Sequence, residues 1–297
     1  MARPPPSASA TAPPKTRRGA SVPPLDPQRH GPSPEHPLRA GLRRLAADTE
    51  VQPHGHAWAQ VALSATGVIR VTTQRSTYLV PPSRAVWIPP HEEHAITVLE
   101  DAEIRVLYIH QDAHCVGPGL VPETGEAWRR CRVLEVSDLL RELVAHLPEH
   151  PTPTRQSLDE HRREQHLCAL VLDELRRAPP IPLGVALPQD KRLLALCQAV
   201  LDDPTGQVLL PDWAKATGAS PRTIARLFRS ELGTTFGQWR QQVLLARAVT
   251  LAAQNKPMHV IASELGYTSA SAFSAMVTRC VGSSPRHFFA SKPLRRP

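Results

Sequence analysis

The segments PDWAKATGASPRTIARLFRSELGTTF (residues 211–236) and PMHVIASELGYTSASAFSAMVTRCVGSSP (residues 257–285) repeat one pattern along the chain. In each segment an apolar helical stretch reaches a glycine, Gly218 or Gly266, and a second apolar helical stretch follows. The offset between these glycines is 48 residues, and the offset between Gly233 and Gly282 is 49. Two copies of a helix, a glycine turn and a helix predict an all-α domain built from two helix–turn–helix units.

Capping residues place the helices of this region. Asp190 is predicted to cap a first helix, and Ser220 is predicted to cap the second helix of the first unit. In the second unit either Ser269 or Ser271 caps the corresponding helix. A long helix that ends near Asn255 is predicted to join the two units.

Three arginines give the second helix of the first unit a basic face. Arg222, Arg226 and Arg229 stand at i, i+4 and i+7, so they share one exposed side, whereas Ile224 and Phe228 face inward. A guanidinium bonds guanine O6 and N7 bidentately, which predicts that Arg222 and Arg226 reach the base edges of DNA. The alternative is an ordinary helical hairpin with solvated arginines, and the presence of a second, related unit argues against it.

Charge is distributed unevenly along the 297 residues, whose formal net charge is +8. Residues 190–297 hold 14 Lys and Arg against 6 Asp and Glu, whereas residues 41–189 hold 15 against 19. A basic C-terminal third and an acidic middle predict two domains with separate tasks. The basic domain is expected to bind a phosphate backbone.

Composition also limits the class of protein. Residues 1–38 are rich in proline and lack the apolar core of a signal peptide, so they are predicted to form a disordered tail. No stretch approaches the roughly 18 uncharged apolar residues that a membrane span needs. We therefore expect a cytoplasmic protein without a membrane partner.

The second unit carries a specific string of residues, Ile261-Ala262-x-x-x-Gly266-Tyr267-x-Ser269-x-Ser271-x-Phe273, followed by Gly282-x-Ser284-Pro285. Over roughly residues 190–290 this sequence resembles the AraC/XylS family of bacterial transcription regulators. The resemblance implies a seven-helix domain, placed at residues 189–292, that binds double-stranded promoter DNA through two tandem helix–turn–helix units. Val277 departs from the family pattern, which usually has an aromatic residue there, and Thr278 stands where a basic residue is common.

The residues predicted to contact DNA lie in both units and in the helix between them. The outward side chains of the second unit are small and weakly polar, so the first unit is expected to discriminate sequence and the second to anchor. Arg229, Arg240 and Arg279 are either phosphate contacts or solvated charges. The full set is Ser220, Arg222, Thr223, Arg226, Arg229, Arg240, Ser269, Ser271, Ser274, Thr278 and Arg279.

Between residues 39 and 125 short apolar runs alternate with Gly, Pro and Asp. Runs at 60–64, 67–71, 75–80, 85–88 and 104–109 have the spacing of strands in a β-sandwich or barrel. Residues 126–188 are predicted as a helical connector, whose apolar faces either pack against the barrel or form the seam of a homodimer. The predicted class is α+β, with a cupin-like β-barrel and helices followed by an all-α domain.

Histidines in the predicted barrel follow the order of two cupin motifs. His54-x-His56 with Gln60, and His94 within Pro89-x-His91-x-x-His94, resemble the motifs that bind one metal ion inside a barrel. Gln60 replaces the family's glutamate, and the loss of its charge weakens such a site. Three interpretations stay open: a divalent metal site, a metal-free pocket for a small-molecule effector, or histidines that complete a polar network. The aromatic candidates for a pocket wall are Trp58, Trp87 and Tyr78.

The string Val80-Pro81-Pro82-x-x-Ala85-x-Trp87-Ile88-Pro89-Pro90 is typical of AraC-type regulators with an N-terminal cupin sensor. The resemblance then spans roughly residues 40–290. It implies a one-component transcription regulator, not an enzyme, that responds to a small molecule or a metal, with RNA polymerase as a partner if it activates. The alternative is a cupin-type metal-dependent enzyme with an accessory helical domain. The missing glutamate and the complete tandem repeat argue against that alternative.

Overall fold

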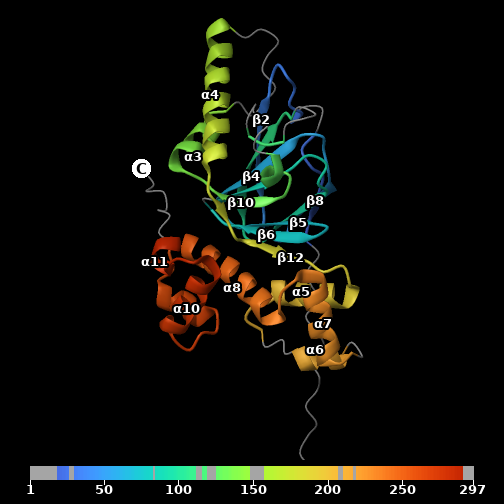
Figure 1. Ribbon diagram of the computed structural model, residues 1–297. Helices are drawn as coiled ribbons and strands as arrows, with labels where there is room; N and C mark the ends of the chain where they lie inside the picture. Colours follow the sequence, from blue (N-terminus) through green and yellow to red (C-terminus); the bar gives the residue numbers. More distant parts are fainter. Residues whose placement is uncertain are drawn as a thin grey trace, which may run out of the picture.

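The computed structural model describes residues 19–26, 30–82, 84–111, 116–118, 125–147, 157–206, 210–216 and 219–289. A sheet-rich part, here called the sheet domain (described residues 19–186), lies above a helical part, here called the helical domain (described residues 190–289) (Figure 1). This arrangement confirms the predicted α+β class. Among the described residues, no helix is both long and apolar enough to span a bilayer.

Two six-stranded sheets form the sheet domain. The first has the order β1-β3-β8-β5-β6-β12 and the second the order β11-β10-β7-β4-β9-β2. Their inner faces share one apolar core, to which Ile69 and Ile96 contribute from the first sheet and Ile88 and Ile104 from the second. The strands are β1 (Ser21–Val22), β2 (Leu38–Leu45), β3 (Glu50–His54), β4 (Ala59–Thr66), β5 (Ile69–Thr73), β6 (Ser76–Val80), β7 (Arg84–Ile88), β8 (His94–Val98), β9 (Ala102–Ile109), β10 (Arg132–Glu135), β11 (Pro180–Ile181) and β12 (Gly184–Ala186).

The five predicted strands correspond to β4, β5, β6, β7 and β9. The segment predicted as a helical connector also contributes β10, β11 and β12, so that expectation was incomplete. These strands have two to four residues, too few to show the alternation of a strand in the sequence. β10 forms by pairing with β7 and β12 by pairing with β6, and β11 pairs with β10.

Part of the segment predicted as a disordered tail has a described structure. Residues 21–22 form β1, which pairs in parallel with β3 so that Ser21 lies opposite Glu50. Leu25 packs against the inner core of the sheets. Residues 1–18 and 27–29 of the predicted tail lie outside the described residues.

Two helices cover the outer face of the second sheet. They are α3 (Asp138–Ala145) and α4 (Leu158–Arg177), and a Ser157–Glu160 capping box begins α4. Val171 and Leu175 of α4 are fully buried against the sheet, which shows that packing against the sheets is one use of the apolar face. Leu139 and Leu170 are about half exposed, at 51% and 49%. A short helix, α2 (Gly125–Trp128), lies over Trp87, whose Nε1 donates to the Trp128 carbonyl.

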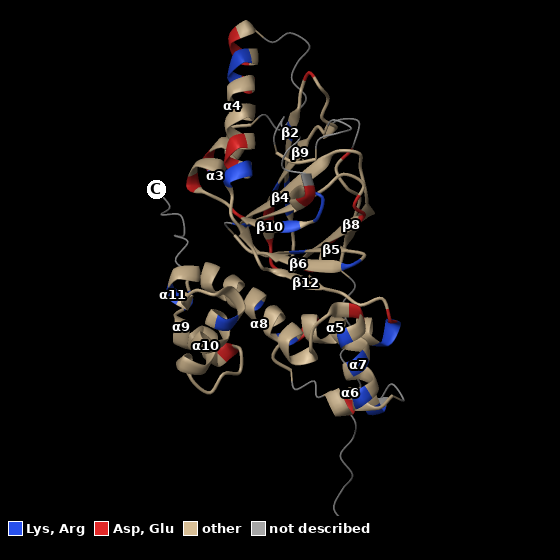
Figure 2. Cartoon of the chain, in the orientation of Figure 1, with Lys and Arg blue, Asp and Glu red and all other residues tan. Residues whose placement is uncertain are grey.

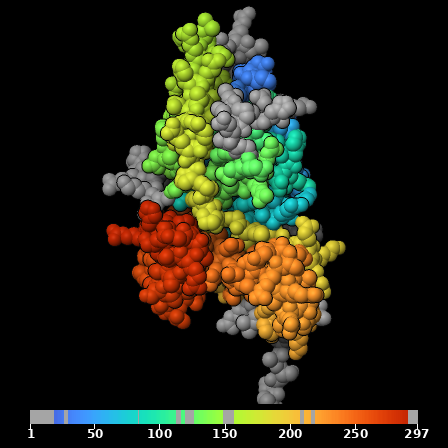
Figure 3. Space-filling model, viewed as in Figure 1, coloured from blue at the N-terminus to red at the C-terminus, as the bar shows by residue number. Residues whose placement is uncertain are grey.

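The helical domain forms two lobes that share one helix. Buried residues of the first half of α8, such as Trp239 and Val243, pack with α5, α6 and α7. The second half packs with α9, α10 and α11. Figure 3 shows the two lobes side by side beneath the sheet domain. The helices are α5 (Lys191–Asp202), α6 (Leu210–Ala216), α7 (Pro221–Leu232), α8 (Phe236–Ala253), α9 (Met258–Glu264), α10 (Ala270–Val281) and α11 (Pro285–Phe288).

Candidate functional site

The repeated sequence produces two units with the same geometry. α6 and α9 have 7 residues each, and α7 and α10 have 12 each. Ser220 and Ser269 cap α7 and α10, which resolves the second cap in favour of Ser269 over Ser271. Gly233 and Gly282 end the two helices at φ 65° and 72°, in the left-handed region that glycine adopts without strain. Gly218, the predicted turn glycine of the first unit, lies outside the described residues.

The three arginines of α7 project from a well-anchored helix. Ile224 and Phe228 are fully buried, and the Phe228 ring meets the Trp239 ring edge to face at 5.8 Å. Arg222, Arg226 and Arg229 are exposed on the remaining surface. Figure 2 shows Lys and Arg on α5, α6 and α7 at this end of the molecule. The lobe therefore offers a rigid helix with exposed guanidinium groups.

The exposed face of α10 is less basic. Ser271, Thr278 and Arg279 are exposed, and Ser274 is half-buried. The Ser269 hydroxyl accepts a hydrogen bond from the backbone of Ala272, as the Ser220 hydroxyl does from Thr223. These two serines therefore hold the N-termini of the recognition-helix candidates. Small polar groups and helix N-termini are suited to phosphate contacts.

Arg240 forms hydrogen bonds within the first lobe of the helical domain. Its Nη2 donates to the carbonyls of Pro204 and Gly206 at 3.2 and 2.7 Å, in the segment that follows α5. The side chain is part-buried, which differs from the expectation of a solvated charge. A phosphate contact by Arg240 stays a prediction, and the hydrogen bonds give it a structural task that sequence spacing did not indicate.

The histidines singled out in the sequence come together between the two sheets. His54 ends β3, His94 begins β8 directly opposite it, and His56 and Gln60 follow in the next turn and strand. The ring centroids are 4.3 Å apart for His54 and His94, 5.4 Å for His56 and His94, and 6.0 Å for His54 and His56. One ring nitrogen of each histidine lies within 4.8 Å of one from each of the other two. His91, in contrast, is exposed and has φ 63°.

Burial keeps these three imidazoles neutral. Desolvation lowers the pKa of His54 and His56, and it lowers the pKa of the 1% exposed His94 to about 3. Hydrogen bonds to backbone carbonyls oppose the effect, but desolvation is the larger cause. At neutral pH the cluster therefore presents lone pairs and not positive charge.

The rings of Trp58 and Tyr108 line the histidine cluster on one side. Trp58 stacks on His56 with ring centroids 5.2 Å apart and an interplanar angle of 7°. Tyr108, which sequence reasoning missed, meets His56 at 5.6 Å from the inward face of β9. Trp87 is fully buried in the core on the outer side of the second sheet, so it is not part of this wall. The alternation of apolar residues along β9 was the signal that placed Tyr108 inward.

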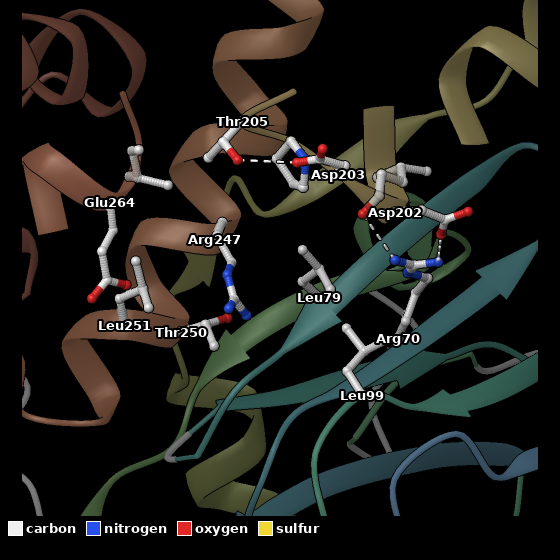
Figure 4. A pocket seen from close by; sticks show the side chains of 13 residues that line it. Arg70, Leu79, Leu99, Asp202, Asp203, Thr205, Arg247, Thr250, Leu251 and Glu264 are labelled. Atoms are coloured by element: carbon white, nitrogen blue, oxygen red, sulfur yellow. Dashed lines mark hydrogen bonds and ion pairs between the residues drawn. The ribbon is translucent and has the colours of Figure 1, made fainter. Parts of the chain in front are cut away.

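A polar junction joins the two domains, and sequence reasoning missed it. Arg70 on β5 donates to the Asp202 carboxylate and the Leu201 carbonyl at the end of α5. Glu100 accepts from Gln254 at 2.7 Å and lies 3.9 Å from Arg247. A cavity of about 430 Å³ lies between the sheet domain and the helices. Figure 4 shows the side chains that line it. Its walls include Arg70, Leu79 and Leu99 from the sheet domain and Asp202, Arg247, Thr250, Leu251 and Glu264 from the helices.

Comparison with known proteins agrees with this division. Residues 36–171 match the AraC-like ligand binding domain family, and residues 213–291 match a helix-turn-helix domain family. The HTH-type transcriptional regulator NimR of Escherichia coli (strain K12) is 30% identical over 253 residues, which cover 85% of this chain and 86% of that protein. The arabinose operon regulatory protein of the same organism is 27% identical over 135 residues, 44% of this chain and 46% of that protein.

A third relative is the HTH-type transcriptional regulator RipA of Corynebacterium glutamicum, which is 29% identical over 112 residues, 38% of this chain and 33% of that protein. All three relatives are named as regulators, which supports a DNA-binding regulator and not the alternative of a cupin-type enzyme. DNA and a small-molecule effector are accordingly the partners of the two domains. The chain belongs to the AraC family of transcriptional regulators, with a ligand-binding domain ahead of a helix–turn–helix DNA-binding domain.

Proposed function

We propose that this regulator reads its operator mainly with α7 and anchors itself with α10. The observation that carries the proposal is the difference between two otherwise matched helices. α7 exposes Arg222, Arg226 and Arg229, whereas α10 exposes serine, threonine and one arginine. Arg222 and Arg226 contact guanine edges, because bidentate guanidinium contacts give about 1–3 kcal/mol of discrimination for each base. Arg229 and Arg279 contact phosphates.

The central helix α8 sets the distance between the two reading helices. It has 18 residues and therefore spans about 27 Å at 1.5 Å per residue. α7 and α10 lie in the lobes at its two ends (Figure 1). Two recognition helices on one face of DNA enter successive major grooves about 34 Å apart. A helix of this length supports simultaneous insertion of both units.

Regulation acts through the junction between the domains. A ligand in the sheet domain changes DNA binding only if its affinity differs between two arrangements of the domains. The histidine cluster is the proposed ligand site. It lies next to β5, the strand that contacts the helical domain, because Thr73 of β5 pairs with His94. Arg70, three residues earlier on β5, contacts α5, and Trp239 of α8 donates to the Ala186 carbonyl of β12 at 2.7 Å. These contacts link the first sheet to α5 and to the first turn of α8.

Further partners follow from the same architecture. We propose that the half-exposed leucines of α3 and α4, Leu139 and Leu170, lie in a homodimer interface. RNA polymerase is the additional partner if the protein activates transcription. The proposed location is the bacterial cytoplasm, on the nucleoid.

Genome-wide mapping of the DNA that the protein occupies tests the proposal. The expected result is a shared motif with two elements about one helical turn apart, one strongly and one weakly defined. Fluorescence anisotropy with the recovered site and with a scrambled site then gives the specificity ratio. Both affinities should fall steeply between low and physiological salt, because phosphate contacts release counterions. Occupancy without a common motif, or binding that ignores salt, contradicts the proposal.

A further inference from the structure

The three clustered histidines are all held in the same way. The Nδ1 atoms of His54, His56 and His94 lie 2.8, 2.7 and 3.0 Å from the carbonyl oxygens of Gln52, Trp58 and Glu92. A carbonyl oxygen only accepts, so each Nδ1 carries the hydrogen and donates it. Each neutral ring therefore presents Nε2 as a lone pair. Backbone carbonyls that fix Nδ1–H are the usual outer partners of metal-binding histidines.

The Nε2 lone pairs of His94 and His56 have no hydrogen-bond donor beside them among the described residues. His94 is 1% exposed, and its Nε2 is buried with no hydrogen-bond partner among the described residues. The Nε2 of His56 lies 2.8 Å from Oε1 of Gln60, so two acceptors face each other. A rotated Gln60 amide would satisfy His56 and leave the His94 nitrogen without a partner.

We propose that His54, His56 and His94 bind a divalent transition-metal ion through their Nε2 atoms, with Oε1 of Gln60 as a weak fourth ligand. One ion satisfies the unpartnered nitrogen of His94 and separates the two facing acceptors of His56 and Gln60. This proposal rests on the proposed function in one respect: it makes the ligand of the histidine cluster a metal ion. Coordination of that ion does not depend on DNA binding.

The ligand set indicates which ions fit. Neutral imidazole nitrogens suit zinc, nickel, cobalt, copper and iron, whereas magnesium and calcium prefer oxygen ligands. Tetrahedral coordination at zinc–nitrogen bonds of about 2.0–2.1 Å places ligand atoms about 3.3 Å apart. One ring nitrogen of each histidine lies within 4.8 Å of one from each of the other two, so a pair of ligand atoms has to approach by at most about 1.5 Å. His54 and His56 are half-buried, which leaves them room to move toward the fully buried His94.

The surroundings favour an ion over an organic ligand at this position. Trp58 and Tyr108 pack closely on His56, and their rings also contact each other at 5.8 Å. An ion needs only the space between the nitrogens.

Metal binding to the full-length, untagged chain tests the inference. After chelator treatment and dialysis, titration calorimetry with Zn²⁺ should give one site per chain, and Co²⁺ should give visible absorption bands of a nitrogen-coordinated ion. His54→Ala should weaken binding at least tenfold, and His94→Gln should abolish it. His166→Ala is the matched control, because His166 is exposed on α4 and should bind metal as the unmodified chain does.

A variant with higher Zn²⁺ affinity provides a second test, because a misfolded protein would lose affinity and not gain it. Gln60→Glu adds a buried carboxylate, which should raise Zn²⁺ affinity at least tenfold and enlarge the increase in Tm that the ion causes. Binding that His54→Ala and His94→Gln leave unchanged overturns the inference, as does a chain that binds no Zn²⁺ or Co²⁺. Operator affinity measured on the same samples separates the two proposals, since a chain that binds its operator but no metal retains the proposed function.

Discussion

Arg70 and Asp202 join the two domains across a distance of 3.2 Å between Nη1 and a carboxylate oxygen. The second amino group of Arg70 donates to the carbonyl of Leu201 at 3.1 Å. That carbonyl belongs to the last turn of α5, where the helix itself supplies no partner. A strand of the ligand-binding domain thus completes a helix of the DNA-binding domain.

Arg70→Met should lower the free energy of unfolding by about 1–3 kcal/mol, because a hydrogen bond from a charged donor contributes about that much. Denaturant titration followed by tryptophan fluorescence measures the change. Asp202→Asn should cost less than about 1 kcal/mol, because the Asp202 side chain is 63% exposed and solvent screens the pair. Equal losses for the two variants would show that the ion pair, and not the bond to Leu201, dominates.

Arg226→Ala should relax sequence preference. We expect a loss of about 1–3 kcal/mol on the operator and a much smaller loss on random DNA, because a base contact discriminates and a phosphate contact does not. Competition anisotropy with both DNAs gives the ratio. Arg177→Ala serves as the control, since Arg177 is exposed on α4 in the other domain and should change neither affinity. A uniform loss on both DNAs would make Arg226 a phosphate contact.

Arg240→Met should destabilise the first lobe by about 1–3 kcal/mol, because the carbonyls of Pro204 and Gly206 lose their charged donor. Thermal and denaturant unfolding measure this effect. Folded protein at low temperature should retain its ratio of operator to random binding. Unchanged stability together with a shallower salt dependence would instead assign Arg240 to a DNA phosphate.

Asp190→Ala should cost about 1 kcal/mol at neutral pH, because the Asp190 carboxylate caps α5 by accepting from Arg192 and Leu193. The side-chain bond to Arg192 holds the pKa of Asp190 down at about 2. A lowered pKa stabilises the fold above the unfolded value and loses that effect as pH falls. The difference between the two proteins should therefore be complete above about pH 4 and shrink toward pH 2.

The capping asparagine separates the two contributions of Asp190. Asp190→Asn keeps an oxygen that caps α5 but removes the charge beside Arg192, so most of the stability at neutral pH should remain. Its stability should also vary less with pH between 4 and 2 than that of the unmodified chain. Unfolding midpoints of the three proteins over this range provide the comparison, and identical pH profiles would contradict the role given to the carboxylate.

The helical domain was predictable from sequence to within a few residues, whereas only some of the strands were, namely β4, β5, β6, β7 and β9. Helix caps such as Asp190, Ser220 and Ser269 act within three residues of themselves, so the local sequence contains the signal. β8 and β10 to β12 are short segments stabilised by partners far along the chain, such as β5 for β8 and β7 for β10. Such pairing leaves little trace in a single stretch of sequence.

By itself, the sequence determined the two helix–turn–helix units and the arginine face of α7, because these depend on local spacing. The resemblance to two cupin motifs predicted His54, His56 and His94 as members of one candidate site. Tertiary structure alone decided that Tyr108 walls the cluster, that α8 serves both lobes and that Arg70 meets Asp202. Arg70 and Asp202 are separated by 132 residues. Contacts over such separations exist only after the sheets and helices have packed, since packing and not local preference brings those side chains together.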